Sequence, residues 1–470
     1  MNQFEKQVRE TVKKNSMLSS GDSVLIGLSG GADSVSLLKA LAGNFFREAL
    51  DLTLHAIYID HGLRPDETPA EIEFAKKIAE ANGVESFFTE KIDVLAYAEK
   101  ERLGKQEAAR ALRYETFETY ANRLGAGKIA LGHTADDQVE TFFMRLLRGS
   151  GAKGLRGIPP VRRTKSKKTI IRPLIETTRP EIEEFLAMSS TSFIQDPTNL
   201  KRDYERNRIR HDLIPVLKKF NPNLTETIAR TTRILADEDR YFESAVLKAL
   251  MRLMRKKTDE EAELFMVPLE SMEIALLRRT LRMVLELVKG LRGLDFGHIE
   301  DIIELIKKGG PGDSLDLPHG IRAVKKYATL LITSKPPVEI GDCGITVPGS
   351  ITIPETGAVI TASLFEKFEK PDVPNIDNDR HRVVLDADKT GFFLVVRGRR
   401  EGDFFQPLGF WGKKKLQDLF VDEKVPRDER GGVPVVTTSG GEVVWVAGLR
   451  GDERFKVDPD TKKFLVLKIR

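Results

Sequence analysis

The sequence has very little cysteine and no long apolar segment. Cys343 is its single cysteine, which excludes an internal disulfide and any zinc site built from several cysteines. No apolar run approaches the ~20 residues that span a bilayer, so we expect no membrane insertion. The segment that begins the sequence, MNQFEKQVRE, is charged and lacks the apolar core of a secretory signal. These absences predict a cytoplasmic protein.

Two familiar phosphate-binding motifs are also absent, but a third is present. Neither the GxxxxGK(S/T) of Walker ATPases nor the GxGxxG of dinucleotide folds occurs. Instead, residues 29–34 read SGGADS, between a β-branched run at 24–28 and a helical pattern at 35–41. Such a turn offers backbone N–H groups and the positive end of a helix to a phosphate, although a plain capped turn is the alternative. The expected ATP contacts are Ser29, Gly30, Gly31, Ala32, Asp33 and Ser34.

The length of 470 residues predicts several domains. Between residues 23 and 148, β-rich runs at 24–28, 53–59, 86–91 and 128–131 alternate with helical patterns, which predicts an α/β fold with a doubly wound parallel sheet. A mainly helical region and then a small β-rich or mixed domain follow. We expect a catalytic domain at 1–215, a helical middle domain at 216–330 and a C-terminal domain at 331–470.

Basic charge is concentrated in one stretch of the chain. The net charge is +4, yet residues 153–210 hold 14 Lys and Arg against 7 Asp and Glu. This surplus suggests a polyanionic partner, although solvated basic faces remain an alternative. Residues 149–172, rich in Gly, Pro and basic side chains, are expected to form a mobile loop beside the nucleotide site.

Two pairs of charged residues are candidates for chemistry. In the expected helix 136–148, an apolar stripe that ends at Leu146 and Leu147 predicts a core-facing side, and Asp137 and Glu140 share the opposite, accessible face. These carboxylates can hold magnesium or an ammonium group, or Asp137 can cap the helix. In the expected helix 105–124, Arg110 and Arg113 lie on one face, where they suit a triphosphate or pair with nearby acids.

Polar residues also follow the expected strands. Asp60 and His61 come after the second strand, and His133 follows the fourth, within GHTADD. Because ligands of open parallel sheets bind at the carboxyl ends of strands, we expect all three to contact the nucleotide. For Asp60 and His61, contact with magnesium is the alternative.

Motifs spread over nearly the whole chain resemble those of the tRNA(Ile)-lysidine synthetases of the long, multi-domain type. SGGADS itself resembles the loop of the PP-loop ATP pyrophosphatases, to which those enzymes belong. Thr134 stands where the family often has a second histidine, so an imidazole role there rests on His133 alone. The segments that carry the resemblance are SGGADS at 29–34, residues 60–64, QEAARALRY at 106–114, GHTADDQVET at 132–141, RGSGAKGLRGI at 148–158, DPTN at 196–199, RNRIRHDLIP at 206–215, residues 402–430 and residues 444–457.

The resemblance implies an ATP-dependent ligation of free L-lysine to the wobble cytidine of tRNA(Ile) with a CAU anticodon, through an adenylated base. ATP and Mg²⁺ are the implied cofactors, and a homodimer is possible. Asp33 would hold the metal, Arg110 and Arg113 would balance developing charge, and Asp137 and Glu140 would bind the lysine and help take its proton. The expected tRNA contacts are Arg206, Arg208, Lys413, Lys414 and Lys415, the last three beside the aromatic pair at 410–411.

Three other functions are weighed against this one. A PP-loop thiolase would generally need catalytic cysteines or a cysteine-bound cluster, and Cys343 lies far from the nucleotide motif. An NAD synthetase-like enzyme would not need the basic segments or the C-terminal domain. A non-catalytic RNA-binding protein would not need Asp33, Ser34, Asp137 and Glu140, and turnover of ATP to AMP would separate it from an enzyme.

Overall fold

A computed structural model describes residues 2–62, 66–164, 166–195, 205–366, 380–410 and 412–470. The chain divides into two compact units, residues 1–241 and 242–470. Helix α12 (Leu224–Leu253) contains the division. Expected features at 63–64, 196–199 and 411 lie outside the described residues.

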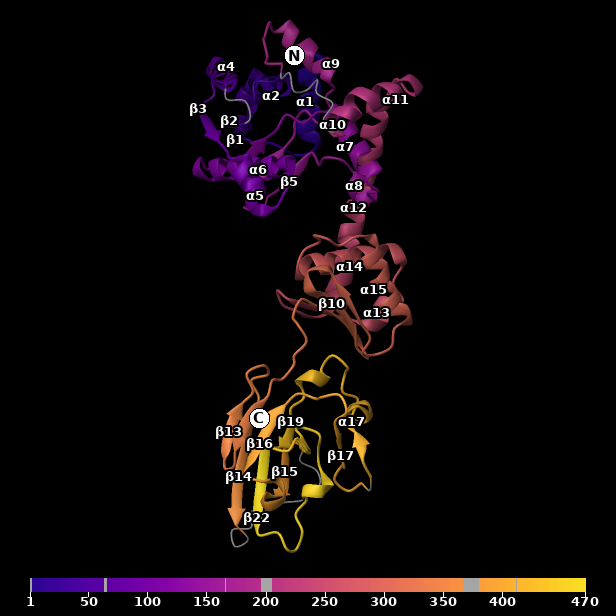
Figure 1. Cartoon of the computed structure of the whole chain (residues 1–470). Coiled ribbons are helices and arrows are strands. Elements are labelled where there is room, and N and C mark those ends of the chain that lie inside the picture. Colours follow the sequence, from indigo (N-terminus) through magenta and orange to yellow (C-terminus); the bar gives the residue numbers. More distant parts are fainter. Residues whose placement is uncertain (1, 63–65, 165, 196–204, 367–379, 411) are drawn as a thin grey trace. The chain divides into compact units, whose positions relative to one another are not determined.

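The first unit contains the predicted parallel sheet (Figure 1). Its strands are β1 (Ser23–Gly27), β2 (Thr53–Asp60), β3 (Ser86–Lys91), β4 (Lys128–Ala130), β5 (Val161–Arg163) and β6 (Thr169–Ile171), in the order β3-β2-β1-β4-β6-β5. All neighbouring strands pair in parallel except β5, which is antiparallel to β6. Strand β1 lies between β2 and β4, so the order in which strands are added to the sheet reverses there, and the loops after β1 and β4 meet at this switch point.

Apolar strands and helices of this unit form its core. Strand β1 is a β-branched and leucine run whose central residues are fully buried, as in a sheet covered on both faces. The helices that follow the strands include α2 (Ala32–Ala42), α4 (Thr68–Ala81), α6 (Lys105–Arg123), α7 (Ala135–Leu147) and α9 (Arg179–Met188). The predicted alternation is confirmed. The expectation of a loop throughout 149–172 is wrong, because β5 and β6 form a hairpin that extends the sheet.

The second unit begins with helices and an antiparallel sheet. The expected helices are present as α14 (Ile274–Val288) and α15 (Phe296–Lys308). Beside them lies a sheet that the helical pattern did not predict, in the order β7-β8-β11-β10-β9. Its strands are β7 (Met254–Lys257), β8 (Glu261–Phe265), β9 (Ser314–Leu317), β10 (Ile321–Lys325) and β11 (Thr329–Thr333). Apolar side chains from the helices and this sheet form one core.

The end of the chain is β-rich, as predicted. Two sheets, β12-β16-β19-β20-β21 and β13-β14-β22-β15, share a core that includes Trp445 and Leu465. A small ribbon pairs β17 (Phe404–Phe405) with β18 (Lys414–Lys415), next to α17 (Leu416–Asp422). The other strands are β12 (Cys343–Thr346), β13 (Gly349–Thr352), β14 (Val359–Glu366), β15 (Arg382–Asp386), β16 (Phe393–Arg397), β19 (Val435–Thr438), β20 (Val443–Val446), β21 (Arg450–Gly451) and β22 (Lys463–Ile469).

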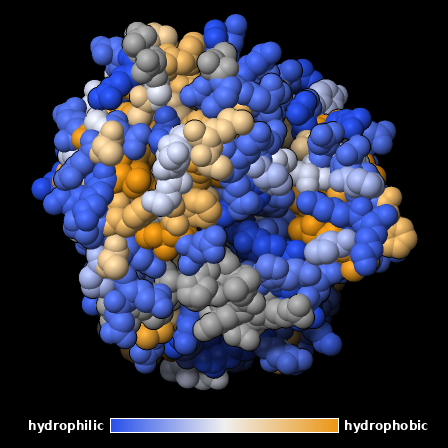
Figure 2. All heavy atoms as spheres, turned by 90° about the horizontal axis from the view of Figure 1, so that it is seen from above, coloured by the Kyte–Doolittle hydropathy of each residue, from blue (hydrophilic) through white to orange (hydrophobic). Residues whose placement is uncertain are grey.

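Hydrophilic side chains cover most of the face shown in Figure 2, and hydrophobic side chains gather there in smaller groups. Among the described residues, none of the helices combines the length and the hydropathy that a bilayer-spanning segment requires.

Candidate active site

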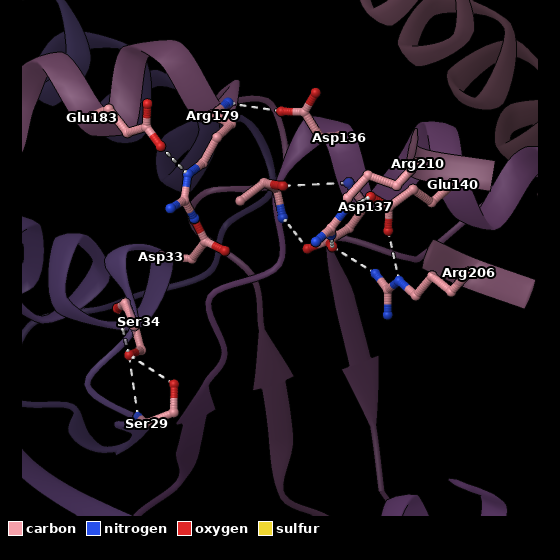
Figure 3. Close-up of polar contacts among 12 residues, drawn as sticks. Ser29, Asp33, Ser34, Asp136, Asp137, Glu140, Arg179, Glu183, Arg206 and Arg210 are labelled. Atoms are coloured by element: carbon pink, nitrogen blue, oxygen red, sulfur yellow. Dashed lines mark hydrogen bonds and ion pairs between the residues drawn. The ribbon is translucent and has the colours of Figure 1, made fainter. Parts of the chain in front are cut away.

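The loop after β1 has the geometry of a phosphate site. Gly30 has a positive φ of 79° and would place a Cβ 2.7 Å from Ile194 Cδ1, so a larger residue is disfavoured there. Gly31 precedes α2 and offers no side chain to cap it, so the N–H groups of the first turn are available to an anion. The Ser34 hydroxyl accepts a hydrogen bond from Ser29 N at 3.2 Å and donates to Gly31 O at 3.0 Å, which fixes the loop (Figure 3).

A cavity of about 220 Å³ adjoins this loop. One part of its wall is apolar and includes Ile57 and Phe117, which suits a flat ring. The polar part contains predicted site residues, namely Ser29, Asp33, Ser34, His61, Arg113 and His133. Gly132 also lines it, and a Cβ there would lie 3.0 Å from the Asp33 backbone, so the loops after β1 and β4 approach closely. The cavity can therefore take the flat ring of a nucleotide whose phosphates lie on the adjoining loop, and we call it the nucleotide cavity.

Asp33 is the carboxylate of this loop. Its Oδ1 lies 2.9 Å from Arg179 Nη1, and Arg179 also contacts Glu183 at 2.7 Å (Figure 3). Burial raises the pKa of Asp33 to about 6, although Arg179 acts in the opposite direction. The described residues contain no cluster of three or more acidic, His or Cys side chains that could enclose a metal. A single carboxylate beside a phosphate loop nevertheless fits Mg²⁺, which is often held by one carboxylate and substrate phosphates.

The two carboxylates of α7 are bound by arginines. Arg206 contacts Glu140 and Asp137 at 2.6 Å each, and Arg210 contacts Glu140 at 2.5 Å (Figure 3). Asp137 also closes the capping box of α7, because its Oδ2 accepts from Thr134 N at 2.8 Å. The capping interpretation of Asp137 is therefore confirmed, and its role as a site residue stays a prediction. Burial raises the pKa of Asp137, and Arg206 opposes that shift.

This geometry corrects two expectations about α7. Glu140 is only 1% exposed, because the segment that carries Arg206 and Arg210 covers it, so its face is not freely accessible. That segment comprises α10 (Glu205–Arg208), a π-helical turn (Ile209–Leu213) and α11 (Ile214–Phe220). The apolar stripe is buried at Val139 and Phe142, but Leu146 and Leu147 are exposed at its end.

His133 is half-buried and uncharged. Burial lowers its pKa well below the ordinary value, and four arginines, led by Arg172, add to the shift. Arg172 Nε donates to His133 Nδ1 at 3.2 Å, which leaves the ring proton on Nε2. The imidazole can thus act in hydrogen bonding but is not a cation near neutral pH.

Other predicted residues occupy different positions. Arg110 lies near Tyr114, not on the cavity wall, and Asp60 accepts a hydrogen bond from Gly62 N at 2.7 Å and does not line the cavity either. Arg208 is exposed, whereas Arg206, expected to contact tRNA, points to the carboxylates. In the second unit, Lys414 pairs with Asp422, and Lys413 lies 4.7 Å from the centre of the Phe404 ring.

Three arginines of the site were not identified as site residues. Arg179 binds Asp33, Arg210 binds Glu140 and Arg172 binds His133. Only Arg210 could have been predicted from the sequence, because it lies four residues after Arg206 and therefore on the same helical face.

Comparisons with known proteins agree with this geometry. The family model described as a PP-loop domain matches residues 1–217, and the one described as the TilS substrate C-terminal domain matches residues 394–467. A tRNA(Ile)-lysidine synthase of Caldanaerobacter subterraneus subsp. tengcongensis is 36% identical over 98% of this chain and 96% of its own length. The enzyme of that name from Clostridium acetobutylicum is 32% identical over 98% of both chains.

A solved structure of a TilS C-terminal domain is 26% identical over 28% of this chain and 97% of its own, with a TM-score of 0.24. The full-length sequence relatives, together with a phosphate loop beside a buried carboxylate pair, lead to one conclusion: the chain belongs to the tRNA(Ile)-lysidine synthase family.

Proposed function

We propose that this protein uses ATP to join free L-lysine to the wobble cytidine of tRNA(Ile) with a CAU anticodon, giving lysidine, AMP and pyrophosphate. The observation that carries the proposal is the junction of two subsites at the ends of β1 and β4. One is the loop 29–34 with its cavity. The other is the carboxylate pair Asp137 and Glu140, which binds the guanidinium groups of Arg206 and Arg210. An ATP-dependent ligation of an amine needs both an anion site and a cation site.

The first step forms the adenylate. The cytidine O2 attacks the α-phosphorus of ATP, an O–P bond forms and pyrophosphate leaves. The N–H groups after Gly31 and the guanidinium of Arg113, which lines the cavity, are placed to bind phosphate oxygens. Asp33 would hold Mg²⁺, which supplies charge neutralisation on the leaving pyrophosphate. His133 is uncharged and contributes a hydrogen bond instead of a further charge.

The second step transfers lysine. The neutral ε-amine attacks C2 of the activated base, a C–N bond forms, and the C–O bond to AMP breaks. Asp137 and Glu140 would bind the ammonium and accept its proton, and the raised pKa of Asp137 favours that acceptance. Since Arg206 and Arg210 occupy these oxygens, lysine reaches them only when at least one guanidinium withdraws.

The proposed function also requires contacts with the tRNA outside the reacting base. Arg208, Lys413, Lys414 and Lys415 are candidate tRNA contacts, and Arg206 joins them when it leaves the carboxylates. A cytoplasmic location, where ATP, lysine and tRNA meet, and assembly into a homodimer remain predictions.

The test is a direct ligation assay. The protein is incubated with ATP, labelled lysine and total bacterial tRNA, the tRNA is digested, and the nucleosides are separated. We expect label on a cytidine derivative and one AMP released per lysine transferred. AMP release without lysine on any nucleoside would contradict the proposal and favour another PP-loop activity on RNA.

A further inference from the structure

Three arginines of the first unit contact one tyrosine, Tyr114, and a fourth precedes it in the chain. Tyr114 OH accepts from Arg172 Nη2 at 3.3 Å and from Arg110 Nη2 at 3.5 Å, and the Arg162 guanidinium lies 4.5 Å from the centre of its ring. Arg113, the neighbour of Tyr114 on α6, lines the nucleotide cavity. We call Arg110, Arg113, Arg162 and Arg172 the arginine cluster.

The cluster lacks counter-charge within the described part of the chain. None of its members forms an ion pair with a described carboxylate, and Arg172 binds only the neutral acceptors Pro159 O, His133 Nδ1 and Tyr114 OH. Arg172 is 1% exposed, and Arg113 Nε is buried without a hydrogen-bond partner among the described residues. Burying the cations Arg113 and Arg172 without a counter-charge is costly, so the cluster to which they belong is prepared for an anion.

The position of the cluster distinguishes its anion from the phosphates on the loop 29–34. Only Arg113 lines the nucleotide cavity, whereas Arg110 on α6 and Arg162 on the edge strand β5 are exposed and outside it. The cluster therefore runs from the cavity wall to the solvent. A base that enters such a cavity from an RNA strand leaves its own phosphates at the mouth, where the exposed guanidiniums lie.

We propose that the exposed members of the arginine cluster, Arg110 and Arg162, bind a backbone phosphate of the RNA strand next to the target cytidine, and so position that base at the nucleotide cavity. The inference rests on the proposed function for the identity of the base. Arg162 is a positioning residue here, since it acts on the RNA backbone and not on the reacting atoms, and the buried Arg172 supports it through Tyr114. Arginine suits the role because its planar fork binds phosphate oxygens with two N–H groups.

Arg162→Gln tests the proposal, and Arg163→Gln is its matched control. Both residues are exposed neighbours in β5, where successive side chains point to opposite faces, so only Arg162 faces Tyr114. Binding of an anticodon stem-loop RNA with CAU is measured against salt concentration, without ATP or lysine. For Arg162→Gln we expect weaker binding and a log–log salt slope flatter by about 0.7 to 0.9, the value for one bound phosphate. Arg163→Gln should match the wild type.

Replacing the phosphate completes the test. An RNA with a neutral methylphosphonate beside the target cytidine should bind the wild type more weakly, while Arg162→Gln should not distinguish it from the normal RNA. Unchanged RNA affinity in Arg162→Gln, equal losses in both variants, or an equal loss of ATP affinity would overturn the proposal. A wild type that shows the expected binding but transfers no lysine would contradict the proposed function instead.

Discussion

Asp33 combines a functional charge with a cost to stability. Its folded pKa of about 6 lies above the ordinary value of 3.8, so between these values the folded state holds a proton that the unfolded state has lost. The resulting stabilisation is complete below the unfolded pKa and is lost as the pH rises through about 6. At neutral pH the fold therefore carries an ionised carboxylate that burial disfavours, which is expected of a group kept for binding a cation.

Asp33→Asn should separate these two effects. We expect AMP release to be abolished and tRNA binding to remain nearly intact, because a metal-binding charge is removed while the basic surfaces are unchanged. We also expect a higher melting temperature than the wild type near pH 8 and little difference near pH 4, measured by thermal unfolding. Glu183→Gln is the control, since it removes the other partner of Arg179 and leaves the loop charge in place. Full AMP release in Asp33→Asn would contradict the role of Asp33 in holding the metal ion.

At the scale of residues, the sequence predicts the phosphate loop but not the arginines that pair with the carboxylates of the site. Six consecutive residues between a strand and a helix identify Ser29–Ser34 because the motif is local. Arg179 lies 146 residues from Asp33, and Arg206 lies 66 from Glu140, so no spacing rule connects them. For Asp60 the sequence predicts a ligand contact from its place after a strand. In the structure its carboxylate accepts a hydrogen bond from Gly62 N within its own turn.

At the scale of elements, strong periodicity made β1 to β4 and their helices predictable. The segments that were missed are short and polar. Strand β5 reads Val-Arg-Arg and is half exposed at the sheet edge, so it shows no apolar pattern. Strands β7 and β8 follow the long helix α12 closely and are stabilised by the sheet formed with β9 to β11, which is a tertiary effect.

The segment 205–220 should control access of lysine to α7. In the ligand-free protein, we expect Arg210→Gln to strengthen lysine binding by at least about fivefold. The substitution frees a carboxylate oxygen of Glu140, for which the lysine ammonium otherwise competes with the Arg210 guanidinium. Isothermal titration with lysine, without RNA, measures this. Arg208→Gln is the matched control, since Arg208 lies two residues before Arg210, is exposed and has no ion pair with these carboxylates. Equal lysine affinity in wild type and Arg210→Gln would show that lysine binds elsewhere.

At the scale of the whole molecule, composition predicts several domains but not their limits. The long helix α12 carries one continuous pattern across residues 241 and 242, where the compact units divide, so no change in composition marks that point. The boundaries at 215 and 330 remain predictions. The β-rich end was predictable from its frequent Gly and Pro and its short apolar runs, which include β13, β16 and β20.

The β17–β18 ribbon is the candidate tRNA-binding element of the second unit, and its lysines are not equivalent. Lys414 pairs with Asp422, whereas Lys413 and Lys415 are exposed and lie beside Phe404, which is opposite Lys415 in the ribbon. An ion-paired lysine gains less from a phosphate, because it must give up its partner first. The contribution to tRNA binding should therefore come mainly from Lys413 and Lys415.

We predict that changing Lys413, Lys414 and Lys415 together to Ala weakens tRNA binding and flattens its salt dependence, by up to about 0.9 of log–log slope for each phosphate that the variant no longer binds. Lys414→Ala alone should change the slope little, and ATP affinity should stay at the wild-type value in both variants, because the nucleotide cavity belongs to the first unit. Filter binding of full-length tRNA over a range of salt concentrations measures these slopes.

If the triple variant kept the wild-type affinity and slope, the tRNA surface would have to be sought in the first unit, in the basic stretch 162–172 and at Arg206, Arg208 and Arg210. A weakening confined to full-length tRNA, with an anticodon stem-loop bound normally, would place the ribbon on a part of the tRNA outside the anticodon arm.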